Sequence, residues 1–363
     1  HDFDLIVRGW NVLLSLLLSR IGGFLGVPML ESTPGTRQVA MSLMHAAGRH
    51  VLFRRTADMV RHGMVSGVAT DTDIEVWISD RTLSDHFHDQ IDRSRLTELN
   101  AQFARGQRPD PRGPQGRQIR EEMAALTFPW KTPKGVMVGY TTTPEIDDFF
   151  LHSVIDSTIQ WRDEAGIHQD AELRACTGAD LTAVVNVLLS FYLKHIMFVE
   201  EAILRPLGVN QHMSLTIWKK RDELLGSLIA AGASSAVAEA ALDLITVRPA
   251  DAAFFLDEHT PGIPLVIEIS EGYLLTPVSG IFRNPFHHIR MLRESASSKL
   301  QNAFREHREG WMADDLYRLF QGNRFQRVAG QTRLRRNGKT VTDIDAAIFD
   351  NVTEELVLFQ LKW

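Results

Sequence analysis

Three polar residues interrupt two apolar runs near the C-terminal end of the sequence. Asp345 lies in "TDIDAAIFD", and Gln360 and Lys362 lie in "LVLFQLKW". Burying an unpaired polar group is costly, so a strand that carries one needs a reason for it. Carboxylate and amide oxygens are ligands that Mg²⁺ or Mn²⁺ accepts, and a lysine ammonium stabilises negative charge that develops on a phosphate. These residue types in this order predict metal-assisted hydrolysis of a phosphodiester.

The spacing of these residues predicts that their side chains meet. Alternate residues of a strand share a face, so Gln360 and Lys362 lie on the same side of the second run. If the two runs pair as a hairpin through "DNVTEE", Asp345 comes close to both. We expect the metal ligands to be Asp345, Gln360 and the backbone carbonyl of Leu361. Asp345, Gln360 and Lys362 form the expected catalytic set, in which Lys362 holds the attacking water or the phosphate.

The formal net charge of −6 conceals a basic segment. From Phe282 to Thr340 the chain has thirteen Lys and Arg residues against five Asp and Glu residues. A local excess of positive charge on an otherwise acidic chain indicates a phosphate-bearing partner for that segment. A solvated helix face followed by a polar hairpin would have the same composition. The residues expected to contact nucleic acid are Arg324, Arg327, Arg333, Arg335, Arg336 and Lys339.

The pattern "DIDAAIFD…LVLFQLKW", preceded by a basic helix and a basic strand, resembles the core of the restriction-endonuclease-like superfamily. It is similar to the branches whose final motif reads Gln-x-Lys or Glu-x-Lys, including the nuclease-related domain and the Mrr-type and Holliday-junction-resolvase-like enzymes. The resemblance covers roughly residues 295–363. It implies that Asp345 binds the metal, that Gln360 is the second metal or water ligand, and that Lys362 is the catalytic lysine.

The sequence departs from the family pattern in two ways. Gln360 replaces the more usual acid, which lowers the negative charge offered to a metal. Family members also continue past the lysine with a further helix and strand, so we expect either a longer native chain or a truncated, inactive core. The family often adds a carboxylate from the helix before the first strand. The candidates for it are Glu309, Asp314 and Asp315.

A purely structural reading of the same residues stays open. Asp343 and Asp345 could flank a turn next to an edge strand, and Lys362 could be an edge-strand charge that discourages aggregation. That alternative predicts exposed side chains that point apart.

The hydrophobic periodicity predicts an α+β chain, with a mainly helical N-terminal and middle region and a C-terminal α/β core. We divide it into a helical region with a short strand (1–117), a mainly helical middle domain (118–260), a β-hairpin with a connecting helix (261–294) and a nuclease-like core (295–363). The Pro, Gly and Arg residues of 106–118 mark the clearest boundary. We expect the nuclease-like core (295–363) to be incomplete at its C-terminal end.

Particular elements follow from local patterns. Helices are expected over 37–65, from Pro144, over 178–208, from Ser214, from Ser234, and over 285–320 with an interruption at Gly310. Strands are expected over 72–80 and 135–143, in a hairpin around Glu271-Gly272, and as three final strands in which 340–350 is one element.

Other chemistry finds little support. His45 and His50 are five residues apart, whereas two metal ligands on one helix face need a spacing of four. "NGKT" at 337–340 lacks the first glycine of a phosphate-binding loop. The single cysteine, Cys176, cannot form an internal disulfide, so a cytoplasmic location is the default. The apolar stretch from Trp10 to Leu30 has Arg20 at its centre, so we expect a buried helix and no membrane segment.

The sequence thus predicts a metal-dependent phosphodiesterase acting on nucleic acid, with DNA as the expected substrate and RNA as the alternative. The resemblance suggests an effector of bacterial defence against foreign DNA. The helical region would bind a protein partner or self-associate. The competing hypothesis is a helical scaffold that carries a degenerate nuclease-like end and has no enzymatic activity.

Overall fold

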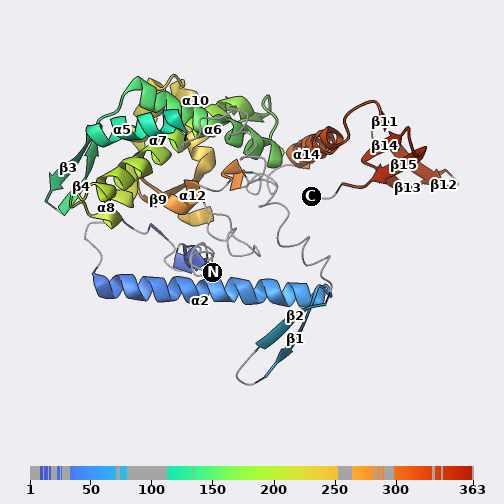
Figure 1. Ribbon diagram of the computed structural model, residues 1–363, viewed down its shortest axis with the longest axis horizontal. Coiled ribbons are helices and arrows are strands. Elements are labelled where there is room, and N and C mark those ends of the chain that lie inside the picture. Colours follow the sequence, from blue (N-terminus) through green and yellow to red (C-terminus); the bar gives the residue numbers. More distant parts are fainter. Residues whose placement is uncertain are drawn as a thin grey trace.

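In the residues that it describes, the computed structural model (Figure 1) contains both helices and strands, which confirms the α+β class. The structure describes residues 9, 10, 12–14, 16, 17, 23, 24, 26, 33–70, 74–79, 113–133, 135–251, 264–281, 284–286, 288, 289, 298–328, 332–336 and 338–361. Most of the predicted boundary at 106–118 lies outside these residues. Lys362 also lies outside them.

The N-terminal part is a long helix followed by a hairpin. Helix α2 (Pro34–Arg61) begins where the Thr33 hydroxyl accepts a hydrogen bond from the Thr36 N–H. Strands β1 (Val65–Ala69) and β2 (Ile74–Ile78) then pair antiparallel and project from the end of α2, as Figure 1 shows. The predicted helix and second strand are confirmed, whereas β1 was not predicted because its glycine and serine weaken the strand pattern.

The middle part is built on α7, a long and strongly apolar helix. The Thr177 hydroxyl accepts from the Asp180 N–H, and the Asp180 carboxylate accepts from the Thr177 N–H, so a capping box fixes its start. By length and composition α7 could cross a membrane, yet half of its most apolar window is buried in the protein. The elements of this part are α5 (Pro114–Leu126), β3 (Thr127–Thr132), β4 (Gly135–Tyr140), α6 (Pro144–Glu164), β5 (Glu172–Leu173), β6 (Cys176–Thr177), α7 (Gly178–Leu204), α8 (Gln211–Leu215), α9 (Arg221–Ala230) and α10 (Ser235–Ile245).

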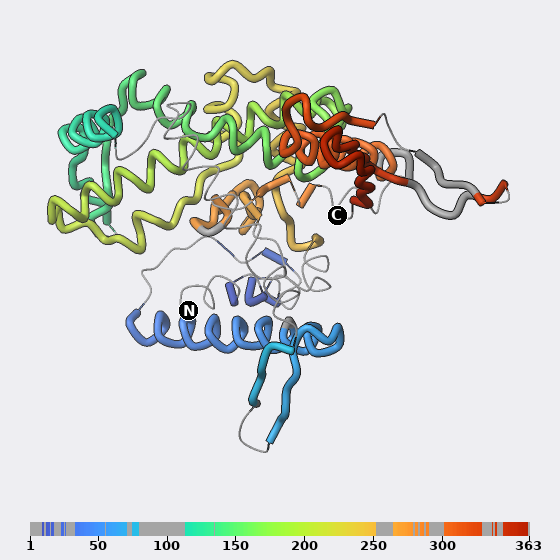
Figure 2. Tube along the Cα trace, turned by 45° about the vertical axis from the view of Figure 1, so that its right-hand side comes forward, coloured from blue at the N-terminus to red at the C-terminus, as the bar shows by residue number. Residues whose placement is uncertain are grey.

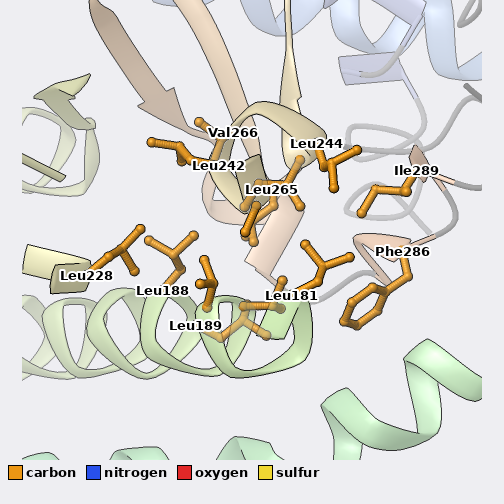
Figure 3. Packing of buried hydrophobic residues seen from close by; sticks show 14 of the residues in the cluster. Leu181, Leu188, Leu189, Leu228, Leu242, Leu244, Leu265, Val266, Phe286 and Ile289 are labelled. Atoms are coloured by element: carbon orange, nitrogen blue, oxygen red, sulfur yellow. The ribbon is translucent and has the colours of Figure 1, made fainter. Parts of the chain in front are cut away.

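The main hydrophobic core lies between α7 and the elements that cover it. Figure 3 shows Leu181, Leu188 and Leu189 of α7 facing side chains from α9, α10 and the strand region around Leu265. All three leucines of α7 have at most 1% of their surface exposed. This burial accounts for the apolarity of α7 without a lipid environment.

A four-stranded sheet lies beside this core, in the order β7-β10-β9-β8. Its strands are β7 (Ile217–Lys220), β8 (Thr246–Val247), β9 (Val266–Ser270) and β10 (Tyr273–Thr276). The predicted hairpin at Glu271-Gly272 joins β9 to β10 and is confirmed, with Gly272 at a φ of +70°. The helix predicted from Ser214 is wrong over Ile217–Lys220, which form the strand β7. These residues have a helical spacing of apolar side chains, but their pairing with β10 makes them a strand.

The C-terminal part begins with α14 (Ser298–Leu319) and continues with β11 (Phe325–Val328), β12 (Thr332–Arg336), β13 (Lys339–Ile344), β14 (Ala346–Asp350) and β15 (Glu355–Phe359). Helix α14 runs through Gly310, so the predicted interruption is wrong. A glycine inside a helix costs only about 1 kcal/mol, and contacts at both ends of α14 offset it. The strand predicted over 340–350 is divided at Asp345 into β13 and β14.

Helix α14 docks on the middle part through its first half. Phe304 is 2% exposed and belongs to the main core. His307 Nε2 lies 3.5 Å from a carboxylate oxygen of Asp163, at the end of α6, and its ring meets the His168 ring edge-on. Burial alone would raise the pKa of Asp163, but hydrogen bonds from His307 and Arg162 outweigh it and hold that pKa below its ordinary value.

Candidate active site

The final strands form a three-stranded antiparallel sheet in the order β11-β14-β15. In the register of β14 and β15, Ala346 pairs with Phe359 and Asp350 pairs with Glu355. Continued by one residue, this register sets Asp345 opposite Gln360. The expected adjacency of the two runs is therefore present in the structure.

Asp345 occupies the bend between β13 and β14, and two hydrogen bonds hold it against the end of β15. Its N–H donates to the Phe359 carbonyl at 3.1 Å. Its carboxylate oxygen Oδ2 accepts from the Leu361 N–H at 2.6 Å. The side chain is half-buried. Among the described residues, no hydrogen-bond partner of the other oxygen, Oδ1, is found.

The other predicted site residues directly follow β15 in the sequence. Gln360 is exposed and directly follows β15, and Leu361 is half-buried. The structure links Leu361 to Asp345 through its N–H; the predicted role of its carbonyl is untested. Lys362 lies outside the described residues, so its position relative to Asp345 stays a prediction.

Helix α14 reaches the sheet through Tyr317. The Tyr317 hydroxyl accepts from the Ala347 N–H at 3.3 Å, two residues beyond Asp345. Asp314 lies three residues before Tyr317 and therefore on the same side of the helix. Asp315 instead pairs with Arg318 at 3.6 Å. Among the three predicted helix carboxylates, Asp314 thus shares a helix side with Tyr317, the residue that contacts the sheet.

Glu309 is the third of these carboxylates, and it lies farthest from the sheet. It precedes Tyr317 by eight residues, which corresponds to about 12 Å along a helix. Its distance along α14 places it nearer the contact with the middle part than the candidate site.

Arg324, one of the predicted nucleic-acid contacts, is held by an acid inside the sheet. Its guanidinium forms a bidentate pair with Asp350, with Nε to Oδ1 at 3.0 Å and Nη2 to Oδ2 at 2.6 Å. The hydrogen bonds from Arg324 hold the pKa of Asp350 well below its usual range. The Val352 N–H also donates to Asp350. This geometry gives Arg324 a role in fixing the end of β14.

The other predicted basic contacts lie on β11 and on the β12–β13 hairpin. The Arg327 guanidinium stacks over the Tyr317 ring at 4.7 Å. Arg336 and Lys339 pair across the end of the hairpin and are exposed. The backbones of Arg333 and Arg335 belong to β12, but their side chains lie outside the description. Figure 2 shows the C-terminal elements, in red, next to the middle part of the chain. The second strand of the hairpin, β13, leads directly into Asp345.

The donor set suits a small divalent cation better than a soft metal. A carboxylate, an amide oxygen and a backbone carbonyl are all hard oxygen ligands, which Mg²⁺ prefers while keeping several waters. The described residues contain no group of three or more His, Cys, Asp and Glu side chains arranged to hold a metal. A cation at Asp345 would therefore depend on amide, carbonyl and water oxygens for its remaining ligands.

Two residues of this region were missed in the sequence. Tyr317 carries no motif, since a tyrosine on an amphipathic helix is an ordinary core residue. Asp350 was visible only as the last residue of an apolar strand, with no sign that it would bind Arg324. Comparisons with protein-family models, with curated proteins and with solved structures find no match. A function must therefore be argued from the geometry of the site.

Proposed function

We propose that the C-terminal part of this chain is a metal-dependent nuclease of the restriction-endonuclease-like type, acting on DNA. The observation that carries this proposal is the position of Asp345. It lies at the bend where the basic hairpin enters the sheet, opposite Gln360 and hydrogen-bonded to the Leu361 backbone. A metal-binding carboxylate and a phosphate-binding arm are thus adjacent in one short segment.

The order of the elements supports the proposal. A helix, α14, precedes three strands that form the antiparallel sheet β11-β14-β15. The acid comes before the middle strand, a turn follows that strand, and the Gln-x-Lys motif follows the last strand in the sequence. This is the arrangement that the family resemblance implies, with the β12–β13 hairpin inserted between the first two strands.

The shape and charge of the β12–β13 hairpin favour duplex DNA as the substrate. A two-stranded β-ribbon fits the major groove of B-form DNA, whereas the major groove of an RNA helix is too deep and narrow to be read by side chains. Arg336 and Lys339 are exposed at the end of the hairpin, where they would contact phosphates. These contacts would position the backbone next to Asp345.

The residues of the site would divide the chemistry between them. When bound, a divalent cation supplies charge stabilisation and lowers the pKa of a bound water. The Leu361 N–H fixes the orientation of the Asp345 carboxylate through Oδ2, and Oδ1 would bind the cation. Gln360 contributes an amide oxygen, and the Lys362 ammonium would hold the phosphate and stabilise the charge that develops on it.

The experiment is nicking of supercoiled plasmid by the full-length protein with Mg²⁺ or Mn²⁺. Asp345→Asn keeps an oxygen that can accept from the Leu361 N–H but loses the charge, and Lys362→Ala removes the ammonium. Each should lower the cleavage rate by about 100-fold or more. Glu355→Gln is the matched control, since it removes an exposed carboxylate at the far end of the same pair of strands. Equal cleavage by all four proteins would remove Asp345 and Lys362 from the mechanism.

A second candidate function is a scaffold that binds DNA without cleaving it. The glutamine at position 360 and the lack of a three-acid cluster among the described residues favour it. This candidate predicts DNA binding by the wild-type protein, no nicking with either metal, and binding that Asp345→Asn leaves unchanged.

The proposed nuclease would act in defence of a bacterial cell against foreign DNA. The resemblance to nucleases with a large additional region supports this biological role. Expression of the full-length protein should lower the plating efficiency of a bacteriophage, and Asp345→Asn should restore it. Equal plating with both proteins would exclude a defence role that depends on cleavage.

A further inference from the structure

Helix α2 has two faces of different character. On one face Gly48, Val51 and Met59 are buried. The backbone at Met44 leaves no room for a side chain at Gly9, so the N-terminal segment lies tightly against this face. The opposite face is exposed and yet apolar: Val39, Leu43 and Phe53 keep 60%, 49% and 54% of their surface accessible. Figure 1 shows α2 along the edge of the molecule.

On the exposed face opposite the buried one, several residues follow the spacing of a coiled coil, whereas the exposed Met41 and Leu52 lie outside that spacing. Beyond Val39, the positions alternate by three and four residues along the helix, which is the heptad pattern of two helices that pack side by side. We call this set the α2 stripe. It consists of Leu43, Ala46, His50, Phe53, Ala57 and Val60, all exposed. An ordinary surface helix has no reason to keep this spacing over about 26 Å.

The side chains of the α2 stripe match in size those of a second α2 stripe that runs in the opposite direction. If a second copy of α2 lies antiparallel, Leu43 faces Val60 of the second copy and Ala46 faces Ala57. His50 then faces Phe53. Large residues meet large ones, and the two small residues meet each other, so the helices could approach closely at the alanine layers. A parallel pair would instead place His50 against His50 at its centre.

The charges beside the stripe select the same orientation. Arg49, Arg54 and Arg61 flank it. In the antiparallel pair these arginines face Thr56, Ala47 and Ala40 of the second copy, in that order. In a parallel pair Arg49 would face Arg54 on both sides, and like charges across a coiled coil are destabilising.

From this symmetry of size and charge we propose that α2 forms an antiparallel two-helix interface with α2 of a second copy of the chain. Because α2 is already helical and packed on its other face, pairing does not require a helix to be ordered. The contact is short and contains two alanine layers, so we expect a dissociation constant on the order of micromolar. The proposal does not depend on the proposed nuclease function.

Sedimentation of the full-length protein between about 1 and 100 µM, a range chosen to bracket that constant, tests the interface. The wild-type protein should pass from monomer to dimer, and Phe53→Asp should stay monomeric. Met41→Asp is the control, because Met41 is 40% exposed but lies off the stripe on the same helix. A wild-type protein that is monomeric throughout, or a dimer that Phe53→Asp leaves intact, overturns the proposal.

Cysteine cross-linking tests the orientation. A mixture of Ala46→Cys and Ala57→Cys proteins should form a disulfide-linked dimer under mild oxidation, and Ala46→Cys alone should not, because its two sulfurs would be about 16 Å apart along the pair. The single native cysteine, Cys176, is buried. Cross-linking of Ala46→Cys alone indicates a parallel pair and overturns the proposed geometry. Binding of a monomeric wild-type protein to anionic phosphatidylserine vesicles, lost in Phe53→Asp, would assign the stripe to a membrane surface instead.

Discussion

Gly166 lies so close to Phe304 that a methyl group on its α-carbon would stand 2.5 Å from the Phe304 carbonyl oxygen. Gly166 also has a φ of +76°, in the region that disfavours other residues. The turn after α6 therefore accepts α14 only because it has no side chain at this position. The contact joins the middle part of the chain to the part that carries the candidate site.

Replacing Gly166 by alanine should loosen this contact. Gly232 is the matched control, because it has a φ of +105° but open space around its α-carbon. Gly232→Ala should cost about 1 to 2 kcal/mol of unfolding free energy through backbone strain. Gly166→Ala should cost clearly more, because the methyl group also meets α14. Equal losses for the two variants in denaturant titrations would mean that α14 does not dock at this turn.

The Arg324–Asp350 pair should stabilise the C-terminal sheet in a pH-dependent way. The pKa of Asp350 is lowered in the folded state by Arg324, so its stabilisation is present above the unfolded pKa of about 4 and is lost as the pH falls. Asp350→Asn should lower the melting temperature at pH 7, and the difference from wild type should shrink towards pH 2. The exposed carboxylate change Glu355→Gln should have little effect. Parallel pH curves for Asp350→Asn and wild type would contradict this role.

His288 should make the protein less stable in mild acid. Burial lowers the pKa of His288 to about 4, whereas an unfolded histidine titrates near 6.5. The unfolded state therefore binds the proton first, and stability falls as the pH drops from about 6.5 towards 4, by about 3 kcal/mol at most. His288→Leu should remove this loss, as measured by urea unfolding at several pH values. The exposed His212→Leu serves as control, and an unchanged pH profile in His288→Leu would refute the assignment.

The β12–β13 hairpin should contribute to the salt dependence of DNA binding. Each phosphate contact adds about 0.9 to the slope of log K against log salt concentration. The double variant Arg336→Ala/Lys339→Ala should thus reduce that slope by roughly 2. Lys131→Ala/Lys220→Ala removes the same charge from exposed positions of the middle part. If both double variants reduce the slope equally, net charge and not the hairpin determines binding.

Local patterns in the sequence predicted those elements whose shape depends on near neighbours. The hairpin at Glu271-Gly272 could be predicted because a glycine with positive φ is a local requirement of the turn. The expectation that Asp345 lies close to Gln360 depended on a hairpin through residues 350–355. The two runs do pair in this way, because the length of a hairpin turn fixes the register of its strands.

Long-range contacts account for what could not be predicted. Strand β7 has a helical period and becomes a strand only because it pairs with β10, more than fifty residues later. Helix α14 continues through Gly310, because Phe304 packs in a hydrophobic core formed by other segments and stabilises the helix. The ion pair between Arg324 and Asp350 joins residues on either side of the β12–β13 hairpin, and local sequence patterns do not indicate that these two residues meet. None of these partners is adjacent in the sequence.

Because α14 is one unbroken helix, it connects the middle part rigidly to the C-terminal sheet. Its first half is embedded in the middle part at Phe304, and its far end supports the strands through Tyr317, thirteen residues or about 20 Å away. A rigid rod of this length converts a tilt of about 10° at the embedded end into a displacement of roughly 3 Å at the other. If Asp345 acts as we propose, reacting groups must be aligned to within about 1 Å, so a small rearrangement among the helices would be enough to align or misalign its carboxylate.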